Sequence, residues 1–110
     1  MKNTLQRGTI RCIVFRDGEE WYAAGLEFNI VESGSTPREA MLLLFEAMQG
    51  YLESAKKIKA RPHILNQKTD VEYEALWKNL EQRKVEQPKN IFSFGTLNLA
   101  QLNDRSLVPA

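Results

Sequence analysis

The 110 residues of this chain are the size of one domain and are long enough to bury a core without disulfides or metals. Hydrophobic residues make up 43% of the sequence and charged residues 26%, which excludes an intrinsically disordered chain. No apolar run approaches the ~20 residues that span a bilayer, and the polar N-terminus is unlike a secretory signal peptide. With Cys12 as the single cysteine, no intrachain disulfide forms. We therefore expect a cytoplasmic protein that does not enter a membrane.

The net charge of +1 hides an asymmetry between the two halves of the chain. Residues 1–55 carry five basic and eight acidic side chains, which is a net charge of −3. Residues 56–110 carry ten basic and six acidic side chains, which is a net charge of +4. Such a split is typical of two surfaces with different partners, and chance is the alternative explanation.

Three short strands are expected near the N-terminus. Residues Thr9–Arg16 are rich in β-branched and aromatic side chains, and Asp17 with Gly18 supplies a turn. Glu20–Ala24 is the expected returning strand, and Asn29–Ser33 is the expected third strand. Connections this short favour an antiparallel meander.

The first of these strands is apolar on both faces. Ile10, Cys12 and Val14 alternate on one face, whereas Ile13 and Phe15 lie on the other. A strand of this kind belongs to a sheet whose two faces are both covered, or to a sheet that presents one face to a partner.

A long helix is expected from Thr36 to about Lys57. Thr36 and Glu39 have the spacing of a capping box, in which each side chain accepts a hydrogen bond from the other residue's backbone N–H. Pro37 occupies the first helical position, where proline is favoured. Apolar residues at helical spacing predict a face that packs on the sheet, and they include Ala40, Leu44, Ala47 and Tyr51. The basic cluster of Lys56, Lys57, Lys59 and Arg61 is interpreted as a solvated helix end, with contact to nucleic-acid phosphates as the alternative.

The second half of the chain predicts a helix followed by a strand. After a loop, a helix begins at Thr69 or Asp70, with Thr69 and Glu72 as a second capping box, and ends near Gln87. Ile91–Leu99 is expected to form a fourth strand, and the last ten residues a loose tail. The predicted fold class is α+β: a meander of three antiparallel strands, a long helix packed on the sheet, a second helix and a fourth strand.

The first half combines several short motifs in a fixed order: the pair Ala23-Ala24, the segment Leu26–Val31, the helix start Gly34-Ser35-Thr36 with Glu39-Ala40, and the helical residues Leu43, Leu44, Ala47, Tyr51, Leu52 and Glu53. Together they resemble the HicB-like antitoxin family over the 46 residues from Ile10 to Ala55. The resemblance implies a reduced ribonuclease H-like sheet. It divides the chain into a β-β-β-α module over residues 1–59 and a helix–strand extension over 60–110.

The same resemblance implies a function. HicB-like proteins bind and neutralise a small basic toxin of the HicA type, which cleaves messenger RNA, by covering its active surface. The acidic first half of the chain is complementary in charge to such a toxin. Toxin contacts are expected on two reversals of the chain, at Glu19, Glu20, Glu27 and Phe28, and ordinary solvated turn residues are the alternative interpretation. The alternative functions are an orphan oligomeric module and a DNA-binding autoregulator without a toxin.

Apolar side chains of the second half predict either self-association or packing within the chain. Tyr73, Trp77 and Leu80 form a stripe on the second helix. Phe92 and Phe94 are expected to point in the same direction along the fourth strand. A long strand can pair with a second copy across a two-fold axis, and the family resemblance implies homodimers or tetramers.

Neither catalytic residues nor a metal or cofactor site is expected, and a nuclease remnant is the enzymatic alternative. Asp17, Glu19 and Glu20 belong to a turn, and no carboxylate lies at an inward strand position, so converging metal ligands are missing. Cys12 lies in mid-strand, where a small buried residue is a simpler explanation than a nucleophile paired with His63. Residues 60–110 place a helix before a strand, which is the wrong order for a ribbon-helix-helix domain, so DNA binding is doubtful.

Overall fold

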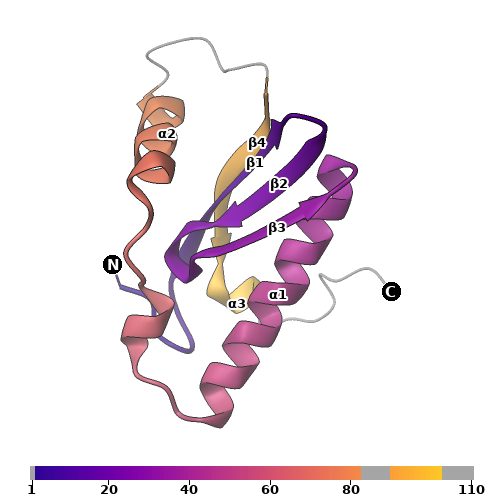
Figure 1. The fold of residues 1–110 in the computed structure, drawn as a ribbon. Helices are drawn as coiled ribbons and strands as arrows, with labels where there is room; N and C mark the ends of the chain where they lie inside the picture. Colours follow the sequence, from indigo (N-terminus) through magenta and orange to yellow (C-terminus); the bar gives the residue numbers. More distant parts are fainter. Residues whose placement is uncertain (1, 83–89, 103–110) are drawn as a thin grey trace.

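The computed structural model describes residues 2–82 and 90–102 and has an α+β fold. Four antiparallel strands form one sheet in the order β3-β2-β1-β4 (Figure 1). The first three strands make the predicted meander, and the fourth pairs with β1. In chain order the elements are β1 (Thr9–Asp17), β2 (Glu20–Gly25), the 3-10 turn η1 (Leu26–Phe28), β3 (Ile30–Gly34), α1 (Pro37–Lys57), the 3-10 turn η2 (Pro62–Leu65), α2 (Val71–Gln82), β4 (Ile91–Asn98) and α3 (Leu99–Leu102).

A helix covers each face of the sheet, with α1 on one side and α2 on the other (Figure 1). The alternation predicted for β1 explains this arrangement. Ile10 and Val14 belong to the core cluster that contains α1, whereas Ile13 belongs to the cluster that contains α2. Of the two alternatives for a strand that is apolar on both faces, two covered faces is the one that the structure adopts.

The two cores differ in size. The core on the α1 side contains the larger set of buried residues: Ile10, Val14, Ala23, Phe28, Ala40, Leu44, Met48, Leu52, Ala55, Leu65, Leu99 and Leu102. The core on the α2 side contains Ile13, Ala24, Leu26, Trp77, Leu80 and Ile91. The α2-side core therefore depends on a few large side chains, and Trp77 is the largest of them.

The start of α1 confirms half of the predicted capping box. The Thr36 hydroxyl oxygen accepts a hydrogen bond from the Glu39 backbone N–H at 3.0 Å, as expected. The Glu39 carboxylate, however, accepts from the backbone N–H of Ser35 at 3.1 Å and not from that of Thr36. Both contacts still satisfy backbone donors at the helix start. The end of α1 at Lys57 is as predicted.

The start of α2 differs from the prediction. Thr69 does not cap the helix, because it is only 7% exposed and its hydroxyl donates to the Leu26 carbonyl oxygen at 3.2 Å. The capping contact comes from Asp70, whose carboxylate accepts from the Glu72 backbone N–H at 2.9 Å. The tertiary contact with η1 therefore outcompetes the local capping box. The predicted end of this helix near Gln87 lies outside the described residues.

The prediction of a loose tail over the last ten residues is wrong for its first part. The strand β4 ends at Asn98, and Leu99 begins the short helix α3, which reaches Leu102. Leu99 and Leu102 are at most 3% exposed, because both pack into the α1-side core. Residues 103–110 lie outside the described part of the chain.

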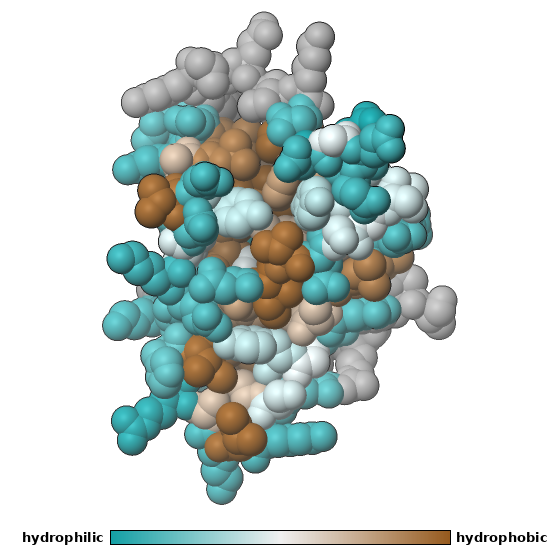
Figure 2. All heavy atoms as spheres, in the orientation of Figure 1, coloured by the Kyte–Doolittle hydropathy of each residue, from teal (hydrophilic) through white to brown (hydrophobic). Residues whose placement is uncertain are grey.

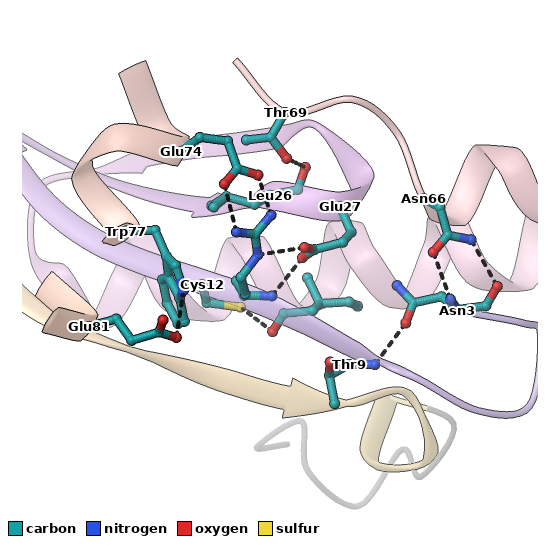
Figure 3. A network of polar contacts seen from close by, with 12 residues as sticks. Asn3, Thr9, Cys12, Leu26, Glu27, Asn66, Thr69, Glu74, Trp77 and Glu81 are labelled. Atoms are coloured by element: carbon teal, nitrogen blue, oxygen red, sulfur yellow. Dashed lines mark hydrogen bonds and ion pairs between the residues drawn. The ribbon is translucent and has the colours of Figure 1, made fainter. Parts of the chain in front are cut away.

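A buried asparagine ties the N-terminal segment to η2 and to the start of β1. Asn3 is 2% exposed and donates to the Leu65 carbonyl oxygen at 2.9 Å. Its side chain also accepts from the Thr9 backbone N–H at 2.7 Å (Figure 3). The side chain of Asn66 exchanges two further hydrogen bonds with the Asn3 backbone. Gly8 has a φ of 134°, and a Cβ atom there would lie 1.8 Å from the Asn3 side-chain oxygen, so only glycine is compatible with this network.

Candidate functional site

A groove lies between the start of α2 and the face of β2 and β3 that α2 packs on. Its volume is about 720 Å³. Ala24, Leu26 and Val31 contribute apolar surface from the sheet side, and Val71 and Tyr73 contribute it from α2. The groove exists because α2 packs its large side chains against Ile13 and its neighbours and leaves this part of the sheet face uncovered.

Apolar side chains remain open to solvent in this groove. Val31 on β3 is 42% exposed, and Val71 at the start of α2 is 76% exposed. Figure 2 shows an apolar patch in the middle of this face, surrounded by hydrophilic side chains. An exposed apolar patch with a polar rim is typical of a surface that binds another molecule.

Two carboxylates at the start of α2 line the same groove. Asp70 and Glu72 line it, and they also line an adjoining hollow of about 400 Å³ together with Asp17 and Tyr73. Glu20 is the register partner of Asp17, so their side chains share one face of the sheet. Lys68 contributes a positive charge to the groove. Arg16 lines the adjoining hollow, so the carboxylates of Asp17, Asp70 and Glu72 outnumber the basic side chains along the two hollows by a small margin.

A cluster of three charged residues holds α2 against the sheet. The Arg11 guanidinium on β1 donates to the Glu27 carboxylate at 2.6 Å and to the Glu74 carboxylate on α2 at 2.9 Å. Figure 3 shows Glu27 and Glu74 directed toward one guanidinium group. The hydrogen bonds with Glu74 raise the pKa of Arg11 above its ordinary value, and the same contact lowers the pKa of Glu74.

Glu27 has a second role in this cluster. Its carboxylate also accepts a hydrogen bond from the Arg11 backbone N–H at 2.7 Å. The β1–β2 pairing ends at Cys12 and Gly25, so the carboxylate takes the place of the next strand residue in the ladder. Glu27 is thus engaged within the chain, which is a structural explanation for a residue that the sequence placed among the toxin contacts.

The other predicted toxin contacts have different positions. Glu19 and Glu20 are exposed at the β1–β2 turn, as expected for contact residues. The expected exposure of Phe28 is wrong, because its side chain is 1% exposed and its ring lies 5.0 Å from that of Tyr51 in the α1-side core. The segment 26–28 forms a 3-10 turn that directs Phe28 inward, so Phe28 lacks the exposure for which it was chosen as a contact residue.

The residues predicted for self-association mostly pack within the chain. Trp77 and Leu80 are buried in the α2-side core, the Trp77 and Phe94 rings meet edge-to-face at 5.7 Å, and the Tyr73 ring lies 6.0 Å from that of Phe15. Core packing, the alternative interpretation, explains these contacts.

Phe92 is the exception among these residues, and the expectation that it points in the same direction as Phe94 is wrong. Ile91 pairs with Phe15 and Ser93 with Val14, so Phe92 is the extra residue of a β-bulge. Its ring contacts Trp21 at 6.0 Å, on the α1 side of the sheet, and its side chain is 52% exposed.

The two residues considered as nucleophile and base lie on different elements, Cys12 on β1 and His63 in η2. Among residues 2–82 and 90–102, no group of three or more His, Cys, Asp or Glu side chains is arranged to hold a metal ion. Burial raises the pKa of the Cys12 thiol to about 12, which keeps it neutral and poorly nucleophilic near neutral pH. His63 is exposed in η2. No helix of the described residues is long and apolar enough to cross a membrane.

The groove and the Arg11 cluster were not predicted from the sequence. One signal was present, since Arg11 is a charged residue on a strand face otherwise occupied by Ile13 and Phe15. A charged group at such a position needs a partner. The identity of that partner depends on α2, whose position on the sheet no local pattern specifies.

No protein-family model, curated protein or solved structure matches this chain. The similarity to HicB-like antitoxins therefore stays a prediction from sequence motifs.

Proposed function

We propose that this protein is a binding module that holds a small basic protein in the groove between α2 and β3, as a HicB-like antitoxin holds a HicA-type toxin. The proposal depends chiefly on one observation: a groove of about 720 Å³ combines exposed apolar side chains with carboxylates at the start of α2. Binding, and not chemistry, is the proposed activity.

The apolar part of the groove supplies the affinity in this proposal. Val31 and Val71 lie on opposite walls and are both exposed, so a partner side chain inserted between them removes apolar surface of both from water. Tyr73 adds an aromatic surface of the kind enriched in binding sites. A basic partner with apolar residues among its charges is complementary to such a site.

The carboxylates supply the preference for a basic partner. Asp70 and Glu72 line the groove, Asp17 lines the adjoining hollow, and Glu20 is the register partner of Asp17. Lys68 and Arg16 offset part of their charge. Complementary charges speed encounter and disfavour acidic partners more than they add affinity. We accordingly expect binding that weakens as the salt concentration rises.

The strand beside the groove supports the same mode of binding. β3 is an outer strand of the sheet, so a partner segment has a strand edge to pair with while its side chains enter the groove. In this proposal the partner covers the groove and the β3 edge together.

The test uses the reading frame next to the gene for this chain, which the proposal expects to encode a small basic protein. The two proteins are co-expressed and passed over a size-exclusion column, and a stable complex is expected. Val71→Lys should weaken the complex by roughly tenfold or more, because it places a like charge and a long polar chain in the groove. Ile58→Lys is the matched control, since Ile58 is 74% exposed and lies after the end of α1. Independent elution of the two proteins, or equal effects of the two variants, would contradict the proposal.

A further inference from the structure

The strand β4 is the second outer strand of the sheet, and no described strand pairs with its outer edge at Phe94–Thr96. One edge of β4 pairs with β1, and no described strand neighbours β4 on its other side. Its eight residues, Ile91–Asn98, include no charged side chain. Natural proteins commonly protect such an edge with lysine, proline or a bulge. Here the bulge at Phe92 lies near one end of the strand, and Ser93–Asn98 pair with β1 in regular register.

The hydrogen-bonding pattern identifies the backbone groups on this outer edge. The Leu99 backbone N–H donates to the Gly8 carbonyl oxygen at 2.9 Å, toward β1. In an antiparallel ladder this direction alternates, so Phe94, Thr96 and Asn98 direct their backbone groups outward. The outward N–H of Asn98 is satisfied by the side-chain oxygen of Gln101 at 3.1 Å. Phe94 and Thr96 thus define the part of the edge that is ready for pairing.

A shallow hollow accompanies this edge on the α1 side of the sheet. Its volume is about 200 Å³, and it lies between Ser93 and Gly95 of β4 and Met41 and Phe45 of α1. A Cβ atom built on Gly95 would meet no other atom within 4 Å. Small residues on β4 therefore leave apolar surface of α1 uncovered next to the unpaired edge.

We propose that a second copy of this chain binds along the outer edge of β4, with the two-fold axis at Gly95. In this register Phe94 of each copy exchanges two backbone hydrogen bonds with Thr96 of the other, so four hydrogen bonds form. Every outward backbone N–H and C=O group of Phe94 and Thr96 then has a partner. Leu97 of one copy lies opposite Ser93 of the other, on the side of the hollow. The two sheets then form one continuous eight-stranded sheet.

Charge distinguishes the second copy from a basic partner at this edge. A two-fold axis brings identical segments together, and the uncharged β4 places no like charges opposite one another. The same lack of acidic side chains gives a basic protein nothing to recognise. β3, by contrast, carries Glu32 and adjoins the acidic groove. The two surfaces lie at opposite edges of the sheet, so this proposal does not depend on the proposed function.

The test is a charge exchange at the axis, read by sedimentation equilibrium at about 1 to 100 µM protein. The wild-type chain is expected to be a dimer. Gly95→Lys and Gly95→Glu should each weaken the dimer by roughly tenfold or more, because residues facing each other across the axis have Cα atoms only ~4.5 Å apart. An equimolar mixture of the two variants should dimerise again, since opposite charges then meet.

The matched control is Gly50→Lys, because Gly50 lies on α1 and a Cβ atom there also meets no atom within 4 Å. It should dimerise like the wild type, and circular dichroism should be the same for all variants. A monomeric wild type, a Gly95→Lys variant that dimerises normally, or a mixture that stays monomeric would overturn the proposal. None of these outcomes affects binding of the basic protein, which is measured separately.

Discussion

Replacing Trp77 by alanine tests whether α2 is held on the sheet as described. The indole is 8% exposed, meets the Phe94 ring edge-to-face and donates from Nε1 to the Glu81 carboxylate at 3.2 Å. The Arg11 guanidinium lies 5.8 Å from the centre of the indole ring. Removing a buried tryptophan costs about 3–5 kcal/mol, of which the aromatic pair contributes about 0.5–1.5 kcal/mol. Since a domain of this size has about 5–15 kcal/mol in total, Trp77→Ala should remove a large share of the stability.

The free energy of unfolding is measured by urea denaturation followed by circular dichroism, and Trp21→Ala is the matched control. Trp21 is only partly buried, at the edge of the α1-side core, where it contacts Phe92 and Arg16. Its loss should cost less, about 1–2 kcal/mol, because the half-buried Trp21 side chain removes less apolar surface from water on folding. Native-state hydrogen exchange adds a local measurement: in Trp77→Ala, the amides of α2 should exchange faster while those of α1 stay protected.

Two results would refute this reasoning. Equal losses for Trp77→Ala and Trp21→Ala would mean that the α2-side core does not depend on its largest side chain. Unchanged exchange of the α2 amides would mean that α2 is held by contacts other than Trp77.

Three further predictions concern single polar groups. Asn3→Ala should destabilise the fold by about 1–3 kcal/mol, because it leaves buried backbone groups without partners, and thermal unfolding should show a lower Tm. A stable Asn3→Ala protein would show that the N-terminal segment does not hold η2. The hydrogen bonds from Arg11 keep the pKa of Glu74 below its ordinary value of 4.5. The ionised carboxylate therefore stabilises the fold at neutral pH, and this contribution is lost as the pH falls from 4.5 through the lowered pKa. Because the Glu74 side chain is 46% exposed, this loss should be under about 1 kcal/mol, and Glu74→Gln should abolish it in urea titrations at several pH values. The Cys12 thiol, with its pKa raised to about 12, should react with iodoacetamide roughly a hundredfold more slowly in the native protein than in urea, and equal rates would place Cys12 at the surface.

The strands and the long helix were predictable because their signals are local. In β1 the alternation of Ile10 and Ile13 indicates two apolar faces, and the structure covers both. The start of α1 follows from Thr36 and Pro37, which act within one turn of the chain. Signals of this kind need no knowledge of the rest of the fold.

The errors arise where a distant contact overrides a local pattern. Thr69 has the spacing of a cap, but its hydroxyl bonds to Leu26, which is far away in the sequence. Phe28 lies on a reversal, where exposure is the usual outcome, but the 3-10 turn directs it against Tyr51. Phe92 changes sides because a bulge interrupts the alternation of β4. None of these contacts has a signature in the neighbouring residues.

The candidate site shows the same limit in its charges. The carboxylates along the groove and the adjoining hollow are Asp17, from the half of the chain with a net charge of −3, and Asp70 and Glu72, from the half with a net charge of +4. Within the first half, Glu27 is already paired with Arg11, so its charge does not contribute to this set. The division by sequence halves predicts an acidic surface within the first half alone, whereas the carboxylates along these two hollows come from both halves. Reversing the charge of Glu72 should consequently weaken binding of a basic partner more than reversing the charge of Glu27, when binding is expressed per amount of folded protein. Titrations of both variants with the partner at several salt concentrations test this, because only the loss of a surface charge changes the salt dependence of binding.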